Sequence, residues 1–254
     1  MKPTFIITSA INTNAGCYPP EIRILQTQET INSIYQFFPD AFTILVDGSS
    51  DRLQNNPPAG WNQLRDRANV FIDLAKNEQI EFLHQTIMDK NPNRTEMGGM
   101  NGIAKTLAEI TLMLNTFEAI ADHPELDRAR ASDRIFKISG RYKLSPLFTP
   151  ADHYHHDRYV FKKADPSWIP DAQNVVGTDH GFASRFWSFD MLLFNDVRDK
   201  YQAMMDDGHD IADAGKYIDI EHLMYKHIGT EKTVQLPYTH CMGTIAPNGL
   251  MIYD

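Results

Sequence analysis

Two short apolar segments separated by one helix-like segment dominate the first fifty residues. Residues 4–9 and 41–46 are rich in apolar and β-branched residues, as strands buried on both faces require. Between them, the segment that opens at Pro19-Pro20 repeats its apolar residues at helical spacing and stops near Pro39. Strand, helix and strand with short joints predict a βαβ unit and a parallel sheet.

The rest of the chain continues the alternation in a less regular form. We expect further helices over 61–76, 102–121, 191–205 and 217–227. We expect further strands over 80–83, 134–139, 158–162, 174–177, 182–189 and 233–236, and a loop over 88–100. No linker or repeat divides the sequence. We therefore predict one domain over 1–254, an α/β fold with a mostly parallel central sheet flanked by helices and a mixed C-terminal half.

Charge and cysteine content narrow the function classes. The chain has 24 Lys and Arg against 33 Asp and Glu, a net charge of −9, which argues against binding of a nucleic-acid backbone. Cys17 and Cys241 lie far apart, so they form neither a disulfide framework nor a zinc motif and fit a reducing compartment. No apolar run reaches the roughly 18 residues of a membrane span. We expect a cytoplasmic protein without an integral membrane segment.

Polar residues follow the first two predicted strands. Thr8, Ser9 and Ala10 end the first strand, and Asp47 and Ser49 follow the second. Ligands of open α/β sheets bind outside the carboxyl ends of the strands, where a carboxylate can accept hydrogen bonds from a ribose or a base. The alternative for the end of the first strand is an ordinary connection, and the alternative for Asp47 and Ser49 is a turn. Neither a dinucleotide-binding glycine motif nor a P-loop is present.

A cationic segment follows the strand predicted at 134–139. Lys137, Gly140, Arg141, Tyr142 and Lys143 lie within seven residues of one another. An Arg fork can hold a phosphate through two hydrogen bonds, Lys adds a point charge, and Gly lets the backbone come close. The pattern indicates an anionic ligand. Surface charges that extend over the sheet edge are the alternative.

These segments together resemble a group of bacterial and viral glycosyltransferases of the GT-A fold. The resemblance rests on Arg23 with its helix, on 46–49, on Phe136-Lys137-Ile138-Ser139-Gly140-Arg141-Tyr142, on 184–188 and on 243–249. It implies that residues 1–145 bind a nucleotide diphosphate sugar as donor and that residues 146–254 bind a glycan or other hydroxyl acceptor. Arg23 and Arg185 would then belong to the donor site, Arg185 assisting with phosphate or acceptor.

The chain departs from that group at the end of the fourth strand. Many GT-A enzymes carry Asp-x-Asp there and hold a divalent cation, Mn²⁺ or Mg²⁺, on the donor diphosphate. Here Ser139-Gly140-Arg141-Tyr142 takes the place. We hypothesise that Arg141, helped by Lys137 or Lys143, neutralises the diphosphate instead.

Carboxylates and a histidine in the C-terminal half complete the candidate set. Glu221, Asp219 and Asp179 are candidates for the base that takes the proton of the acceptor hydroxyl. An acid in the first helical turn is also typical without any catalytic role, which is the alternative for Asp219 and Glu221. His240 is a candidate metal or diphosphate contact by the same resemblance. We expect a structural or solvated role for the histidines of 153–156.

Two further interpretations remain open. The Gly-rich residues 97–102 precede a helix and could bind an anion, or serve only as a connector. The chain could also be a non-catalytic nucleotide or sugar-binding module, or a nucleotidyltransferase on a similar sheet. The sequence leaves the donor, the acceptor, the stereochemistry and the oligomeric state undefined.

Overall fold

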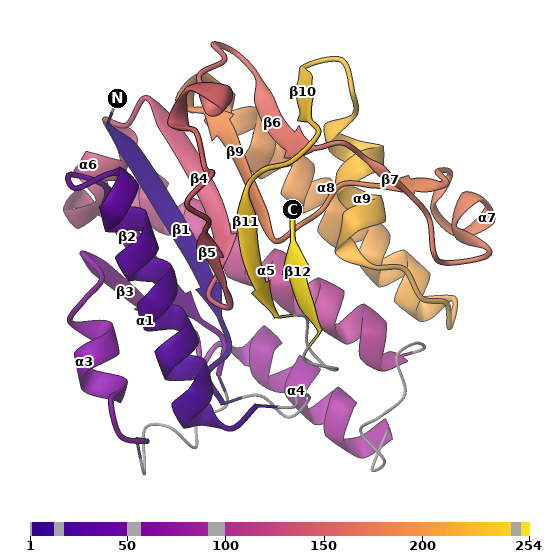
Figure 1. Ribbon diagram of the computed structural model, residues 1–254. Coiled ribbons are helices and arrows are strands. Elements are labelled where there is room, and N and C mark those ends of the chain that lie inside the picture. Colours follow the sequence, from indigo (N-terminus) through magenta and orange to yellow (C-terminus); the bar gives the residue numbers. More distant parts are fainter. Residues whose placement is uncertain (1, 13–17, 50–56, 91–99, 245–249) are drawn as a thin grey trace.

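A seven-stranded sheet in the order β10-β6-β9-β4-β1-β2-β3 forms the centre of the protein (Figure 1). The computed structural model describes residues 2–12, 18–49, 57–90, 100–244 and 250–254. The strands of the sheet are β1 (Pro3–Ser9), β2 (Phe42–Asp47), β3 (Val70–Asp73), β4 (Arg134–Ser139), β6 (Tyr159–Lys162), β9 (Phe186–Asp190) and β10 (Thr233–Leu236). Strands β1 to β4 are mutually parallel, and β9 runs antiparallel to both β4 and β6. The predicted mostly parallel sheet with a mixed C-terminal half is confirmed.

Helices and a second, smaller sheet cover the two faces of this sheet. The helices are α1 (Pro20–Phe37), α3 (Trp61–Arg65), α4 (Glu78–Lys90), α5 (Met100–Asp122), α6 (Asp127–Arg130), α7 (Ala172–Val176), α8 (Phe194–Asp213) and α9 (Ile220–Ile228), with 3-10 turns at Pro124–Leu126, Pro150–His153 and Met191–Leu193. The smaller sheet joins β5 (Tyr142–Leu144), β11 (Cys241–Thr244) and β12 (Met251–Tyr253), and β7 (Asp165–Pro166) pairs with β8 (His180–Gly181).

Alternate residues of β1 reach two different hydrophobic cores. Phe5 and Ile7 pack on the face that carries α1 and β5, whereas Ile6 packs on the face that carries α5, α8 and α9. Every residue of β1 and β2 is buried, as expected for strands with helices on both faces. The registers therefore bring the carboxyl ends of β1, β2 and β4 to the same edge of the sheet (Figure 1).

Most of the predicted elements are observed, and three predictions are wrong. The helix expected over 61–76 ends at Arg65, and Val70–Asp73 instead pairs with β2, where its β-branched residues fit the sheet. The strand expected at 80–83 lies within α4, because Ile80 and Leu83 are one helical turn apart and share a buried face. The strand expected at 174–177 belongs to α7, which Gly177 ends with φ +84°. Of the expected loop, residues 91–99 lie outside the described residues.

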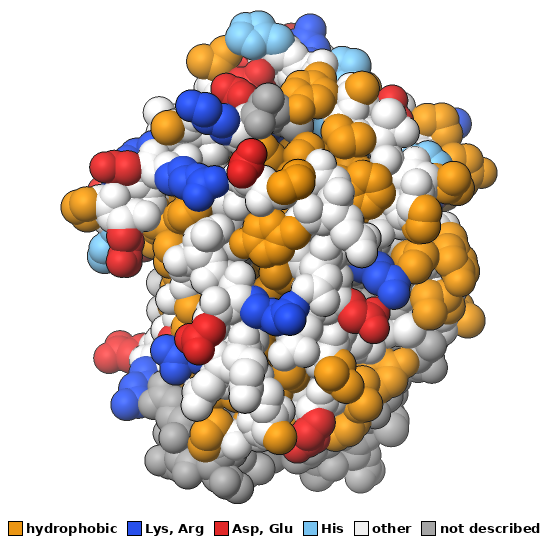
Figure 2. All heavy atoms as spheres, turned by 60° about the vertical axis from the view of Figure 1, so that its left-hand side comes forward, with side chains coloured by type: hydrophobic (Ala, Val, Ile, Leu, Met, Phe, Trp, Pro, Cys, Tyr) orange, Lys and Arg blue, Asp and Glu red, His pale blue; other side chains and the backbone are white. Residues whose placement is uncertain are grey.

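Strands from both halves of the sequence share the central sheet. Strand β4 pairs with β1 on one side and with β9 on the other. Acidic and basic side chains lie interspersed over the described part of the face shown in Figure 2. Among the residues described, no helix is long and apolar enough to cross a membrane.

Candidate active site

The first residues after β1, Ala10 to Asn12, are held by a buried carboxylate at the end of β2 and its neighbour Ser49. Asp47 Oδ2 accepts hydrogen bonds from the Ser9 hydroxyl and from the Ile11 N–H at 3.0 Å, and Oδ1 accepts from the Ser49 N–H at 2.9 Å. Burial raises the pKa of the Asp47 carboxyl, and the hydrogen bonds from Ser49, Ser9 and Ile11 oppose that rise. The Ser49 hydroxyl in turn accepts from the Asn12 N–H at 2.8 Å. The structure thus uses Asp47 and Ser49 to shape the backbone next to Thr8, Ser9 and Ala10.

Helix α1 packs directly on the carboxyl ends of β1 and β4. The Arg23 guanidinium is buried and donates from Nη1 to the Ala10 carbonyl at 2.9 Å. The Thr27 hydroxyl donates to the Gly140 carbonyl at 3.0 Å. A Cβ at Gly140 would lie 2.8 Å from Thr27 Oγ1, so this close approach explains the glycine. Arg23 therefore lies at the same sheet edge as the cationic segment after β4.

Arg141 projects from that segment beside two other cations. Its side chain is half-buried, its Cζ lies 5.8 Å from the Tyr142 ring centroid, and its Nη1 is buried without a hydrogen-bond partner among the described residues. Desolvation, then the charges of Arg141 and Arg23, lower the pKa of Lys105 on α5. Arg23, Lys105 and Arg141, here called the cation cluster, come from three separate elements, and the charges of the two arginines act on Lys105.

No pattern in the sequence indicated that Lys105 belongs to the cation cluster. Its spacing from Glu109 is that of an exposed ion pair on one helix. In the structure Glu109 contacts Lys137 instead, at 2.5 Å. Only the packing of α5 against β1 and β4 brings Lys105 to the site.

Lys137 lies inside the protein. Its ammonium contacts Glu109 Oε1 at 2.5 Å, the Ser139 hydroxyl at 3.0 Å and the Ser184 carbonyl at 2.6 Å. These contacts use all three of its N–H donors. Lys143, the other expected helper of Arg141, forms a surface pair with Glu29 at 2.9 Å. The structure thus gives each of these two lysines a carboxylate partner within the chain.

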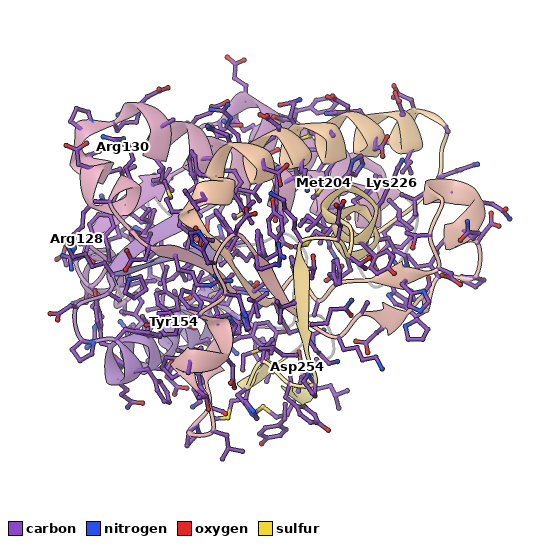
Figure 3. The ribbon with its side chains drawn as sticks, turned by 90° about the horizontal axis from the view of Figure 1, so that it is seen from above. Arg128, Arg130, Tyr154, Met204, Lys226 and Asp254 are labelled. Atoms are coloured by element: carbon purple, nitrogen blue, oxygen red, sulfur yellow. The ribbon has the colours of Figure 1, made fainter. Side chains whose placement is uncertain are left out.

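Arg185 joins the cation cluster to the C-terminal strand. Its Cζ lies 5.8 Å from the same Tyr142 ring that Arg141 approaches, and its Nη1 forms an ion pair with Asp254 Oδ2. Figure 3 shows Asp254 at the end of β12. The other carboxylate oxygen of Asp254 lies 3.4 Å from Lys162 Nζ. The positive charge of Arg185 is therefore already paired with a carboxylate of the chain.

Glu221 lies in the first turn of α9, next to Arg185 and Lys137. The Ser184 hydroxyl donates to Glu221 Oε1 at 2.7 Å, while the Ser184 carbonyl accepts from Lys137. Burial, together with the negative charges of Asp219 and Glu109, raises the pKa of Glu221 to about 7. A carboxyl group with this pKa can hold or release a proton near neutral pH.

The two other candidate bases are placed differently. Asp219 is the N-cap of α9, and its carboxylate contacts the His222 N–H at 3.2 Å, the His222 ring, and Trp168 Nε1 at 3.0 Å. Asp179 is exposed and pairs with His180 Nδ1 at 2.6 Å, which lowers the pKa of Asp179. The structure thus couples Asp219 electrostatically to Glu221 and places Asp179 directly before β8.

The candidate histidine and the histidine-rich loop lie beyond β5. The His240 carbonyl accepts from the Ser145 N–H at 2.8 Å, and the backbone of His240 has φ +55°. His153 is buried beside Phe136, its Nδ1 lies 2.8 Å from the Ser188 hydroxyl, and burial lowers its pKa to about 3. His153 thus has the structural role expected of it.

The described residues at the end of β4 do not fit a divalent cation. Mg²⁺ and Mn²⁺ take oxygen ligands, mostly carboxylates. The strand end instead presents Ser139, whose hydroxyl contacts Lys137, then Gly140 and Arg141. Elsewhere in the described ranges, no group of three or more His, Cys, Asp or Glu residues could hold a metal ion.

Comparison with known proteins establishes the fold. No protein-family model and no curated protein sequence matches the chain significantly. The solved structure of galactosyltransferase LgtC, in complex with donor and acceptor sugar analogs, is similar over 92% of this chain and 73% of that one, with a TM-score of 0.51 and 11% identity. Mouse xyloside xylosyltransferase 1 (apo form) aligns over 92% of this chain and 84% of its own, with a TM-score of 0.45 and 11% identity. The chain thus has a GT-A-like fold, as predicted.

Proposed function

We propose that this protein is a glycosyltransferase that moves a sugar from a nucleotide diphosphate sugar to a hydroxyl group of a glycan or other acceptor. The observation that carries the proposal is the cation cluster of Arg23, Lys105 and Arg141 at the carboxyl ends of β1 and β4, with the Glu221 carboxylate close by. The GT-A-like fold supports it, since ligands of open α/β sheets bind at this edge.

The leaving group explains why cations gather there. In the transfer, the bond between the anomeric carbon and the diphosphate oxygen breaks, and both electrons leave with the nucleoside diphosphate. The negative charge that develops needs fixed donors. Arg141, whose buried Nη1 has no hydrogen-bond partner among the described residues, and Lys105 supply them, and Arg185, which approaches the same Tyr142 ring, adds a third cation.

Glu221 supplies the base in this scheme. The acceptor oxygen forms the new bond to the anomeric carbon, and its proton passes to the Glu221 carboxylate. Ser184 orients that carboxylate through its 2.7 Å hydrogen bond. Lys137 acts as a positioning residue, because it binds the Ser184 carbonyl rather than reaching the ligand. Asp219 and Asp179 remain alternative candidates for the general base, and mutation of each would test them.

The nucleotide half of the donor fits the loop after β1. Thr8, Ser9 and Ala10 offer small side chains and backbone groups, and Asp47 and Ser49 hold that loop in shape. Gly140 allows α1 and the ligand to approach β4, and the Tyr142 ring lies near both Arg141 and Arg185. His240 stays a candidate contact of the diphosphate.

A donor panel tests the proposal. The protein is incubated with nucleotide sugars based on UDP, GDP, CMP and dTDP, and nucleotide release is measured with and without mixed glycan acceptors. We expect turnover or slow donor hydrolysis that Arg141→Ala abolishes and that Lys143→Ala, a surface control two residues away, leaves unchanged. Binding without turnover of any donor would support a non-catalytic module, and pyrophosphate release from a nucleoside triphosphate would support a nucleotidyltransferase.

The charge of the site gives a second test. Because the cations at the end of β4 stand where a metal-binding carboxylate pair would be, we propose that turnover continues in excess EDTA. Loss of activity in EDTA that Mn²⁺ or Mg²⁺ restores would contradict this part of the proposal and leave the transferase assignment intact.

A further inference from the structure

The one exposed tryptophan among the described residues contacts the N-terminus of α9. Trp61 and Trp187 are 7% and 0% exposed, whereas Trp168 is 59% exposed. Leaving an indole in water forgoes the free energy that its burial would contribute, so such a residue is commonly kept for contact with a ligand or a partner.

Trp168 is held in place although it is exposed. Its Nε1 donates to Asp219 Oδ2 at 3.0 Å. The preceding residue, Ser167, places its hydroxyl 2.6 Å from His222 Nε2, and its N–H donates to the Asp179 carbonyl at 2.6 Å. The indole is therefore fixed to the N-terminus of α9, two residues before Glu221.

A second aromatic ring extends this surface toward the cation cluster. The Tyr217 ring centroid lies 6.2 Å from that of Trp168, with the planes tilted by 53°. Tyr217 packs over Gly102 of α5, where a Cβ would lie 2.2 Å from Tyr217 Cε2. Gly102 lies one helical turn before Lys105, so the aromatic pair and the cation cluster are neighbours along α5.

We propose that Trp168 and Tyr217 form a stacking platform for a sugar ring of the acceptor, an inference that rests on the proposed function. A sugar ring has an apolar C–H face and a rim of hydroxyls. The tilted aromatic pair offers the apolar face, and the Asp219 carboxylate, which already accepts from Trp168 Nε1, offers an acceptor at its edge. A rigid aromatic side chain binds at a low cost in conformational entropy.

The position of Trp168 and Tyr217 favours the acceptor sugar as their ligand, rather than the donor nucleotide. The proposed nucleotide contacts lie at β1 and β2, on the α1 side of the cation cluster. The platform lies on the α9 side, next to the proposed base. An acceptor sugar stacked on Trp168 would thus bring a hydroxyl toward Glu221, with the donor diphosphate beyond it.

Fluorescence quenching tests the platform without requiring turnover. Because the two other tryptophans are buried, neutral acrylamide will quench mainly Trp168, and Trp168→Phe provides the background. We expect at least one of lactose, cellobiose, maltose and N-acetylchitobiose to lower the quenching constant about twofold or more, while UMP and GMP do not. Protection by the nucleotides, or by none of the ligands, would overturn the proposal.

Kinetics with an active donor and acceptor give the second readout. Trp168→Ala should raise the KM for the acceptor about 10-fold, as loss of one stacking contact predicts, with donor hydrolysis in the absence of acceptor unchanged. Trp168→Phe keeps a stacking ring but lacks the Nε1–H bond to Asp219, so it should restore most of the acceptor affinity. A Phe variant as impaired as the Ala variant would assign Trp168 a structural role and overturn the proposal. Absence of turnover with sugar protection intact would contradict only the glycosyltransferase assignment.

Discussion

Glu221 is the side chain whose chemistry depends most on its surroundings. An isolated glutamate is ionised at neutral pH, but here burial and the neighbouring Asp219 and Glu109 raise its pKa to about 7. The hydrogen bond from Ser184 fixes which oxygen faces the protein. The same geometry suits Glu221 to the proposed role of base and destabilises the folded state when the carboxyl group is ionised.

As a base, Glu221 predicts an acid limb in the pH profile. Turnover should fall as the pH drops below about 7, because the protonated carboxyl cannot accept the acceptor proton. Glu221→Gln should reduce kcat about 10²- to 10⁴-fold, the usual contribution of general base catalysis. Glu231→Gln, an exposed control ten residues away, should leave kcat unchanged. A pH profile without an acid limb near 7 would rule out this role.

The raised pKa also predicts a pH-dependent stability. Between the ordinary value of 4.5 and about 7 the folded state holds a proton that the unfolded state has lost, so this group's contribution to stability declines as the pH rises through that range. Glu221→Gln removes the charge and should raise Tm at pH 8 more than at pH 4.5. An equal change in Tm at both pH values, measured by calorimetry, would contradict the assignment of the pKa.

A buried ion pair joins β4 to α5 beneath the site. The Lys137 side chain is 1% exposed and that of Glu109 is 28% exposed. Lys137→Met leaves Glu109 and the Ser184 carbonyl without their partner and should lower the free energy of unfolding by about 3–5 kcal/mol. Lys143→Met removes an exposed pair with Glu29 and should cost about 1 kcal/mol or less. Urea unfolding of both variants checks this, and equal losses would refute it.

The three-stranded sheet depends on Gly243, which packs against the backbone of Arg141. Gly243 of β11 pairs with Tyr142 of β5, and a Cβ there would lie 2.2 Å from the Arg141 carbonyl oxygen. Because that obstacle is backbone, Gly243→Ala should separate β11 from β5, lower stability by about 1–3 kcal/mol and displace Arg141. Tyr253→Ala, at an exposed position of β12, is the control. If Gly243→Ala were as stable in urea as the wild type, the pairing register of β11 with β5 would be contradicted.

For the molecule as a whole, the cation cluster links ligand binding to global stability. Arg23, Lys105 and Arg141 come from α1, α5 and the end of β4, so a diphosphate bound as we propose would bridge both faces of the sheet. A nucleoside diphosphate that fits should stabilise the protein by about 2.7 kcal/mol at 100 times its Kd, and the monophosphate at equal concentration by less. Thermal denaturation with each nucleotide measures this. Equal stabilisation by the diphosphate and the monophosphate would contradict binding of the diphosphate by the cation cluster.

Local patterns in the sequence were enough for the main frame of the fold. The long apolar runs at 4–9, 41–46 and 134–139, and the helical spacing over 102–121, correspond to observed elements because each pattern spans several turns or a whole buried strand. Short apolar runs such as 80–83 and 174–177 fit a helix and a strand equally well, and packing against α5 and α9 decides between them. The strand ends that carry Asp47 and Arg141 could be located for the same reason as the strands themselves.

The partners of the charged side chains were beyond the reach of any local pattern. Lys137 lies 28 residues from the Glu109 that neutralises it, and Lys105, Arg23 and Arg141 meet only once two helices pack on opposite faces of one sheet. Burial, which raises the pKa of Glu221, is likewise a property of the packed chain. The pattern of residues along the chain determined the long strands and helices, because each such pattern is strong enough by itself. Which cation remains available to a ligand depends on distances across the sheet, because electrostatic interactions follow separation in space and not separation in sequence.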